Sequence, residues 1–282
     1  MLSKIFHFGT SRGKPDDFVP DAGRQAREYV EYCDSIMKHM PLDSFTTARG
    51  MYRSLIPTVD FPGLEPLRTL LEQRRSNRTF SGEELSFSQL SVIIDETFRY
   101  RKHDQEAYRR MGMSTPTVRR SSPSGGALQS CEAYLVGRKV SGMDPGIYHF
   151  RSHERSLGLV APLSKDFSFG LLCGGQMFAD DLSAAIVITC RFEKLMWKYK
   201  HSHSYRVALF DAGHLSQTAL LLATAVGMRT WVTAAFFDDE VRRELRIPSM
   251  STECPLLIIG LGTGPFNPFD AHLGAGYVGK NG

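Results

Sequence analysis

The order of segments in this sequence predicts an α+β fold. Strand-like and helical runs follow one another with one hairpin and long crossover segments, and neither a regular βαβ pattern nor an internal repeat is visible. The 282 residues are 42% hydrophobic and 23% charged, which is ordinary for a chain that buries a large core. We expect a main domain over residues 64–282, preceded by a partly helical extension over residues 1–63.

Helical periodicity is present in the extension and at the start of the main domain. Apolar residues share one face over Ala22–Met40, and Pro41 ends that segment. A short amphipathic helix follows around Leu67 and Leu71, and a further helix opens at Ser86. The residues of this last helix that are spaced for burial are Leu90, Ile93, Ile94, Thr97 and Phe98.

Most of the remaining ordered segments are expected to be strands. Ala184–Cys190 is apolar and rich in β-branched residues, which is typical of a central strand. Gly146–Phe150 and Ser156–Val160 flank a polar turn and predict a hairpin. Val207–Val226 is instead helical and almost wholly apolar after Ser216, so we expect it in the core or at a subunit interface. The other expected strands are Tyr134–Val136, Arg229–Ala235 and Leu256–Leu261.

Composition argues against several classes of function. A net charge of +4 is too small to indicate nucleic-acid binding. The five cysteines form no CxxC pair and no zinc-type cluster with histidine, so we expect unpaired thiols in a reducing compartment and no metal site. The N-terminus lacks the apolar core of a signal peptide, and no apolar run approaches the roughly 18 residues of a membrane span. We therefore expect a cytoplasmic protein that does not contact membranes.

The segment from Arg99 to Arg120 is locally basic, with seven Lys and Arg residues against Asp104 and Glu106. It has no clear periodicity, so we expect a loop. Such a loop could bind an acidic peptide or a partner protein. It could equally be a solvated loop with no partner.

Lys198 and Tyr199, directly after Trp197, form the pattern that points most directly to proton chemistry. A phenol with a pKa of about 10 is a poor base at neutral pH. A neighbouring ammonium group favours the phenolate and thereby lowers that pKa. On these residues alone, a lysine lying along an apolar surface beside a half-buried tyrosine is the commoner explanation.

Two other segments have the composition of ligand-binding sites. Arg74, Arg75, Ser76 and Arg78 combine guanidinium groups, which bind phosphate through two N–H groups, with a hydroxyl donor, although a solvated basic helix end would have the same composition. The turn Ser122-Pro123-Ser124-Gly125-Gly126 lets backbone approach a flat ligand, because consecutive glycines remove side-chain obstruction. A surface turn is the simpler explanation, since neither GxGxxG nor a P-loop lysine is present.

Asp211 and His214 lie three residues apart and can share one face of a helix. A carboxylate that satisfies a histidine near a helix end is commoner than a catalytic pair. No serine lies in a GxSxG motif, so this pair does not indicate a hydrolase.

Taken in order, the sequence motifs resemble the nitroreductase superfamily, and most closely its SagB-type branch of azoline dehydrogenases. The resemblance covers roughly Leu70 to Gly262, and its motifs are individually weak but specific as a series. They are Arg74-Arg75-Ser76-Asn77-Arg78-Thr79-Phe80, Ser122-Pro123-Ser124-Gly125-Gly126-Ala127-Leu128-Gln129, Gly146-Ile147-Tyr148-His149, Trp197-Lys198-Tyr199, Tyr205-Arg206, Asp211-Ala212-Gly213-His214-Leu215-Ser216-Gln217, Arg229-Thr230-Trp231 and Pro255-Leu256-Leu257-Ile258-Ile259-Gly260-Leu261-Gly262.

The resemblance implies an intertwined homodimer with a mixed sheet flanked by helices, and FMN bound where the two subunits meet. The flavin phosphate and ribityl chain would be held by Arg74, Arg75, Ser76 and Arg78. The turn that would lie against the isoalloxazine, supplied by the partner subunit, contains Ser122, Pro123, Ser124 and Gly125.

Two further parts of the implied flavin site depart from the family pattern. Ala234 and Ala235 lie where relatives offer a backbone N–H near flavin N5, but Ala235 stands where a glycine is common. After Gly262 the only basic residue is Lys280, whereas many relatives carry basic residues for the phosphate in that region.

The resemblance also implies a reaction, in which a thiazoline or oxazoline of a peptide or carrier-bound substrate is oxidised to the azole. Tyr199 would act as the general base, and Lys198 would depress its pKa or steady developing negative charge. A cyclodehydratase is an expected partner. Two alternatives remain open: an NAD(P)H-dependent nitroreductase or quinone reductase, and a flavin-free scaffold subunit of a peptide-modifying complex.

Overall fold

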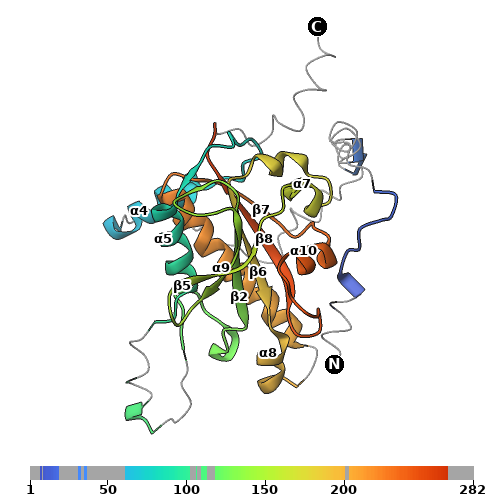
Figure 1. Ribbon diagram of the computed structural model, residues 1–282. Helices are drawn as coiled ribbons and strands as arrows, with labels where there is room; N and C mark the ends of the chain where they lie inside the picture. The colour runs from blue at the N-terminus through green and yellow to red at the C-terminus, as the bar shows by residue number, and fades with distance from the viewer. Residues whose placement is uncertain are drawn as a thin grey trace.

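An antiparallel sheet with helices on both faces forms the centre of the molecule (Figure 1). The computed structural model describes residues 7, 9–18, 31–32, 35–36, 61–101, 106, 109–112, 118–200 and 203–265. These ranges include every site residue that the sequence predicts, but only a small part of the N-terminal extension.

Six strands pair in the order β5-β4-β2-β6-β8-β7, and every pairing between them is antiparallel. The predicted α+β class is confirmed. The sheet differs in one respect from the expected mixed sheet, because parallel pairing within the described residues is confined to β1 with β3 and to a bridge between Ser76 and Thr230. The strands are β2 (Cys131–Gly137), β4 (Gly146–Arg151), β5 (Ser156–Pro162), β6 (Ala184–Cys190), β7 (Arg229–Thr233) and β8 (Cys254–Gly262).

The absence of parallel pairing in the main sheet has a topological cause. Strands β6 and β7 run in the same direction, since both are antiparallel to β8, and a helical crossover joins them in the chain. This crossover would normally create a parallel pair. Strand β8, the last strand of the described chain, lies between β6 and β7. Each of these two strands therefore pairs antiparallel with β8 instead of parallel with the other.

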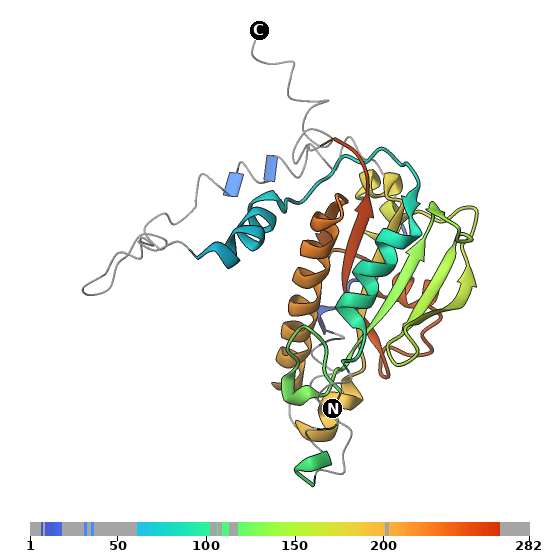
Figure 2. The same ribbon diagram turned by 90° about the vertical axis from the view of Figure 1, so that its left-hand side faces the viewer.

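Helices cover both faces of the sheet (Figure 2). On one face lie α5 (Phe87–Phe98), α8 (Phe192–Lys198) and α9 (His203–Ala225). On the other lie α7 (Phe169–Leu172), η3 (Met177–Asp181) and α10 (Asp238–Glu244). The smaller elements are η1 (Pro62–Leu64), α4 (Glu65–Gln73), β1 (Leu85–Ser86), η2 (Gly125–Ala127) and β3 (Val140–Ser141).

The elements with the strongest sequence patterns are confirmed. All five residues expected to be buried in α5 are buried, at one-turn spacings that face the sheet. Strand β6 is buried throughout and lies between β2 and β8, as its apolar sequence predicts. Strands β4 and β5 form the predicted hairpin. The expected helix over Ala22–Met40 lies outside the described residues, apart from four helical positions.

Helix α9 has two different faces. The face toward the sheet buries four alanines and one leucine, so most of the helix backbone packs close to the strands. These are Ala208, Ala212, Leu215, Ala219 and Ala223. The opposite face exposes Leu209 and Phe210, with side chains 46% and 59% accessible, and no atom would contact a Cβ at Gly213. The expectation of core burial is therefore confirmed for one face only.

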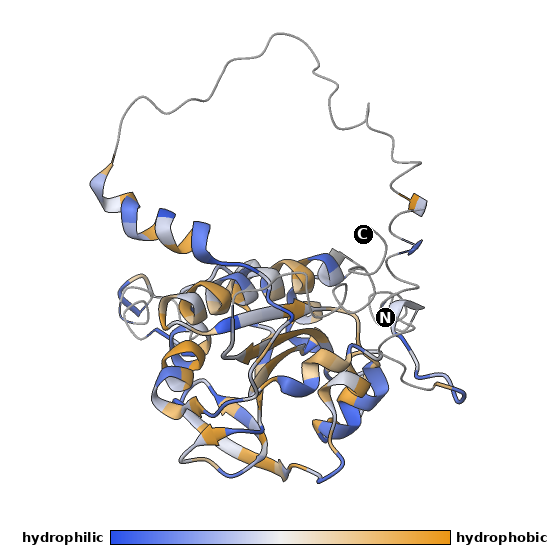
Figure 3. Ribbon diagram, turned by 90° about the horizontal axis from the view of Figure 1, so that it is seen from above, coloured by the Kyte–Doolittle hydropathy of each residue, from blue (hydrophilic) through white to orange (hydrophobic). Residues whose placement is uncertain are grey.

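Helix α4 extends away from the body of the molecule (Figures 2 and 3). None of its residues is buried. Leu64, Leu67 and Leu71 each expose more than 40% of their surface, although their spacing gives the helix one apolar side. A helix with an apolar side and no buried residue lacks the packing that ordinarily stabilises it.

Part of the basic segment has a structural role rather than a solvated one. Arg120 is 5% exposed. Its guanidinium donates to the backbone oxygens of Phe98 and Cys131 and to the Ser152 hydroxyl, at 2.9, 2.8 and 3.1 Å. Arg120 thus joins the end of α5 to the start of β2. The alternative of a solvated loop is wrong for this residue, because three acceptors that face inward require a buried donor.

The described start of the N-terminal extension packs against the main body. Arg12 and Asp238 exchange two hydrogen bonds, at 2.7 and 3.0 Å, and the Arg12 guanidinium lies over the Phe237 ring. His7 packs against the rings of Phe192 and Tyr205, which stack on each other. This part of the extension therefore contacts the first residues of α8, α9 and α10.

The four cysteines that lie in the described ranges are buried, and no disulfide joins any two of them. Cys33 lies outside those ranges. Among the helices of the described chain, none is both long enough and apolar enough to cross a membrane.

Candidate active site

The turn that contains the predicted flavin-binding glycines is fixed to helix α9. The Asp211 carboxylate accepts hydrogen bonds from the Ser124 hydroxyl at 2.7 Å and from the Gly125 N–H at 3.0 Å. Ser122 bonds to Thr218 on the same helix, at 2.7 Å between the two hydroxyl oxygens. A Cβ at Gly125 would overlap the side chain of Val207, so only glycine allows this close approach.

Helix α8 ends beside this turn. Lys198 is its last residue, and the Tyr199 N–H donates to the Leu195 oxygen at 2.7 Å. Lys198 Nζ lies 5.9 Å from the centre of the Tyr199 ring. A Cβ at Gly126 would lie 2.9 Å from both Lys198 Nζ and Tyr199 Oη. The two polar tips therefore converge over Gly126, which itself has a left-handed φ of +61°.

The accessibility of these side chains suits a ligand site. Tyr199 is half-buried and packs against the core, whereas Lys198 is exposed and Trp197 is 70% exposed. The phenol is thus held by packing while its hydroxyl stays near the surface. The sequence-predicted pair and the sequence-predicted glycine turn lie together within one chain.

The arginine-rich segment lies elsewhere, beside strand β7. Asn77, which is fully buried, donates its N–H to the Thr230 oxygen at 2.8 Å, and Ser76 bridges to the same residue. Arg75 is exposed and lines a cavity of about 430 Å³ together with Arg229. Arg74 and Arg78 are half-buried on either side of this contact. Sequence reasoning missed Asn77, whose side-chain amide also bonds to the Thr79 oxygen.

The two groups of predicted flavin residues lie at opposite ends of α9. The glycine turn contacts Val207 near its start, and the arginine-lined cavity includes Thr224 near its end. At about 1.5 Å of rise per residue, these points are separated by about 25 Å along the helix axis. One chain therefore does not bring both groups around a single ligand.

Ala234 and Ala235 follow β7 and are both exposed. The Ala235 N–H donates to the Thr233 hydroxyl at 2.9 Å, and the Ala235 oxygen accepts from the Gln176 side chain at 3.3 Å. A contact between the Ala235 N–H and a ligand would have to replace the bond to Thr233.

The Asp211 carboxylate bonds to the glycine turn, in place of the pairing with His214 that the sequence suggested. Both Asp211 oxygens accept from the glycine turn, and the residue is 3% exposed, whereas His214 is exposed. Helical spacing gave no indication of the turn, because the contact joins residues about ninety positions apart. Asp211 is therefore a structural member of the site. No group of three metal-ligating side chains occurs among the residues described.

A helix-flanked antiparallel sheet with a glycine turn packed on one long helix defines an α+β protein of the nitroreductase type. A model of the nitroreductase family matches residues 71–263, and the chain belongs to this family. The sequence-based identification as a SagB-type member of the nitroreductase superfamily is confirmed.

The sequence of this chain is similar to those of proteins whose names describe different functions. A protein of Methanocaldococcus jannaschii named as a nitroreductase is 25% identical over 206 residues, which are 72% of this chain and 95% of that protein. The microcin B17-processing protein McbC of Escherichia coli is 30% identical over 149 residues, which are 50% of this chain and 53% of McbC. The chain thus matches almost all of the archaeal protein and about half of McbC.

A solved structure has the same fold over nearly the whole chain. A chain of the E. coli microcin synthetase McbBCD complex with a truncated microcin precursor bound superposes with a TM-score of 0.60 at 20% identity. The match covers 94% of this chain and 92% of that chain. The nitroreductase-like fold expected from the sequence is confirmed.

Proposed function

We propose that the protein is an FMN-dependent dehydrogenase that oxidises a thiazoline or oxazoline of a peptide or carrier-bound substrate to the azole. The observation that carries this proposal is the convergence of Lys198 Nζ and Tyr199 Oη over Gly126. The similarity to McbC, whose name describes processing of microcin B17, supports a substrate of peptide type.

The residues fit a flavin in two separate groups. The Gly125–Gly126 turn presents backbone without side chains, which suits a flat ring, and Asp211 holds it in place. Guanidinium groups from Arg74, Arg75 and Arg78, with the Ser76 hydroxyl among them, match the charge and donors that a phosphate requires. Bound FMN would supply the acceptor for a hydride from the substrate ring.

A homodimer would bring the two groups together. Because about 25 Å of α9 separates them within one chain, a second chain that packs with its α9 antiparallel could place its glycine turn beside the first chain's arginines. The exposed apolar residues on α4 and on the outer face of α9 support such an interface. We therefore propose that each flavin site uses residues of both subunits.

Within this site the two polar side chains have separate roles. Tyr199 accepts the proton that leaves the ring carbon of the azoline. Lys198 supplies a positive charge at the same turn, which steadies negative charge that develops on the substrate. The half-buried Tyr199 ring restricts the phenol to one orientation, so base and ring meet in a fixed geometry.

The direct test mixes the purified protein, without oxygen, with a synthetic peptide that carries one thiazoline. We expect a yellow protein whose visible flavin absorbance falls on mixing, and a product lighter by two hydrogen atoms in the mass spectrum. A peptide with thiazole in place of thiazoline is the control and should leave the absorbance unchanged.

A second candidate is an NAD(P)H-dependent nitroreductase, which the match to 95% of the archaeal protein favours. Rapid loss of flavin absorbance with NADPH, combined with indifference to the thiazoline peptide, would support this candidate and contradict the proposal. Purification without any flavin would contradict both and favour a scaffold subunit.

A further inference from the structure

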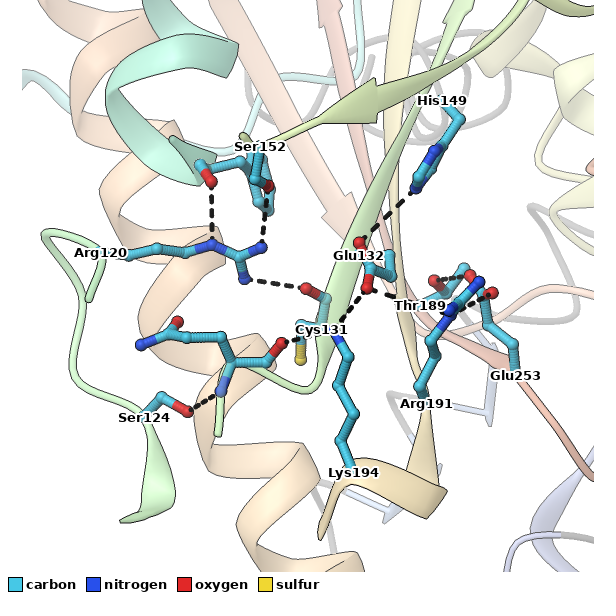
Figure 4. Close-up of polar contacts among 12 residues, drawn as sticks. Arg120, Ser124, Cys131, Glu132, His149, Ser152, Thr189, Arg191, Lys194 and Glu253 are labelled. Carbon is cyan, nitrogen blue, oxygen red and sulfur yellow. Dashed lines mark hydrogen bonds and ion pairs between the residues drawn. The ribbon is translucent and has the colours of Figure 1, made fainter. Parts of the chain in front are cut away.

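An ionic network built around two buried carboxylates, Glu132 and Glu253, lies beside helix α8 (Figure 4). Glu132 on β2 is 8% exposed, and its carboxylate accepts from Lys194 Nζ at 2.8 Å. His149 Nε2 lies 3.6 Å from the other carboxylate oxygen. Arg191, which precedes α8, lies between Glu132 and Glu253, at 4.0 and 3.2 Å from their oxygens. Sequence patterns do not indicate this network, because its members are far apart in the chain: they lie on β2, β4 and α8 and at the positions just before α8 and β8.

Glu132 is ionised at neutral pH. Burial by itself would raise its pKa, but the contact with His149 and the positive charge of Lys194 outweigh burial and lower the pKa to about 2. The Lys194–Glu132 contact is therefore an ion pair with one partner largely removed from water. Removing either partner alone would leave the other charge unbalanced.

The same lysine also contacts the segment that follows the glycine turn. Lys194 Nζ donates to the Gln129 oxygen at 3.3 Å, and the Gln129 N–H donates to the Ser124 hydroxyl at 3.0 Å. Ser124 in turn donates to Asp211. Gln129 has a left-handed φ of +49°, which is unfavourable for a residue with a side chain and needs outside support. A continuous chain of polar contacts thus connects α9, the glycine turn, β2 and α8.

Lys194 is four residues before Lys198, so the two lysines lie one turn apart on the same side of α8. The helix has only seven residues, and a change in its tilt or height would move its last residue directly. Lys194 is therefore anchored to the segment over which Lys198 and Tyr199 converge.

We propose that Lys194 and Glu132 are a positioning pair that fixes the end of α8, and with it Lys198 and Tyr199, over Gly126. This inference rests on the proposed function, because it assigns the pair to the geometry of that reaction. Neither residue touches the reacting atoms. A buried ion pair is often no more stabilising than apolar residues of similar size, so stability alone is a weak reason for its presence.

The experiment separates positioning from stability with the double variant E132Q/K194M, which removes both charges and leaves none unpaired. The single variant K194M should lower the midpoint of urea unfolding, whereas the double variant should recover most of that loss. Turnover of the thiazoline peptide should nevertheless remain lower by about 10- to 100-fold in the double variant, with KM within about twofold of wild type.

A second readout does not depend on activity. In protein with labelled tyrosine and glycine, we expect a nuclear Overhauser contact between the Tyr199 ring and the Gly126 α-protons, assigned by its loss in Tyr199→Phe. This contact should be lost or strongly weakened in E132Q/K194M. The matched control is Thr189→Val, which removes the hydroxyl bond to Glu253 in the same network and leaves Lys194 and Glu132 paired. It should retain both the contact and the turnover.

Normal turnover together with an intact Tyr199–Gly126 contact in E132Q/K194M would overturn the inference. So would a Thr189→Val variant that loses turnover as severely, since the effect would then belong to the network as a whole. Either result can be told apart from failure of the proposed function, which would be seen as wild-type protein that does not oxidise the peptide at all.

Discussion

At the scale of single residues, the site depends on a position without a side chain. Gly126 leaves room for two polar tips that would each lie 2.9 Å from a Cβ, and its φ of +61° is one that other residues adopt only at a cost. Gly125 leaves room for Val207 in the same turn. The pair Lys198 and Tyr199 and the glycine turn are therefore parts of one arrangement.

Gly126→Ala should keep the fold and the flavin but lower turnover at least about tenfold, because the new methyl group displaces Lys198 Nζ or Tyr199 Oη. The matched control is Gly142→Ala. Gly142 has a similar φ of +71° but open space around its Cβ, so this change introduces backbone strain without the contact. Both variants should lose about 1 kcal/mol of stability, and equal turnover in the two would contradict the steric explanation.

Arg74→Ala should lower the FMN content of the purified protein, because a guanidinium that binds phosphate is lost. Arg68→Ala on the neighbouring helix α4 removes an exposed arginine paired with Glu65 and is the control. The measurement is the ratio of flavin to protein absorbance. Unchanged flavin content in Arg74→Ala would exclude that residue from the phosphate site.

At the scale of elements, how much could be predicted from the sequence depended on whether the pattern was local. The buried residues of α5 follow helical spacing, and β6 is a continuous apolar segment. Both patterns can be read from the sequence of the element alone, and both were predicted. The insertion of β8 between β6 and β7 could not be, because it concerns which strands pair across the whole domain.

The same division applies to the candidate site. Lys198, Tyr199 and the glycine turn were found because neighbouring residues form a recognisable motif. The bonds of Asp211 to the glycine turn, the contacts of Lys194 and the buried role of Arg120 were missed because the partners are distant in sequence. Nothing in a local pattern distinguishes a buried arginine from the exposed ones beside it.

Arg120→Met should destabilise the protein by about 3 kcal/mol, because it leaves the buried oxygens of Phe98 and Cys131 without their donor. Arg110 belongs to the same basic segment and is 76% exposed, in an ion pair with Glu106. Arg110→Met should therefore cost less than about 1 kcal/mol. Urea unfolding measures both, and equal effects would mean that Arg120 is not a structural anchor.

At the scale of the whole molecule, we propose a homodimer as one explanation for the two exposed apolar surfaces and for the separation of the two groups of residues in the proposed flavin site. The outer faces of α4 and α9 are unusual places for leucine and phenylalanine in a chain that stays alone. The distance along α9 requires a second chain if one flavin is to contact both groups of residues.

Phe210→Asp should weaken the dimer and lower flavin content together, because a carboxylate would be buried in the proposed interface. Leu159→Asp on strand β5 is the matched control, since Leu159 is 62% exposed and Phe210 is 59% exposed. Sedimentation analysis gives the mass of each variant, and absorbance gives its flavin content. A Phe210→Asp protein that retains the wild-type mass and flavin would contradict an interface on α9.

The central claim, that the Lys198–Tyr199 pair performs the proton chemistry of an azoline oxidation, is tested most directly by Tyr199→Phe. This change removes only the phenol oxygen and leaves the ring in its packed position. We predict that the variant keeps its FMN and its oligomeric state, while anaerobic loss of flavin absorbance on mixing with the thiazoline peptide slows by at least about 100-fold. A variant that reacts at the wild-type rate would contradict the account.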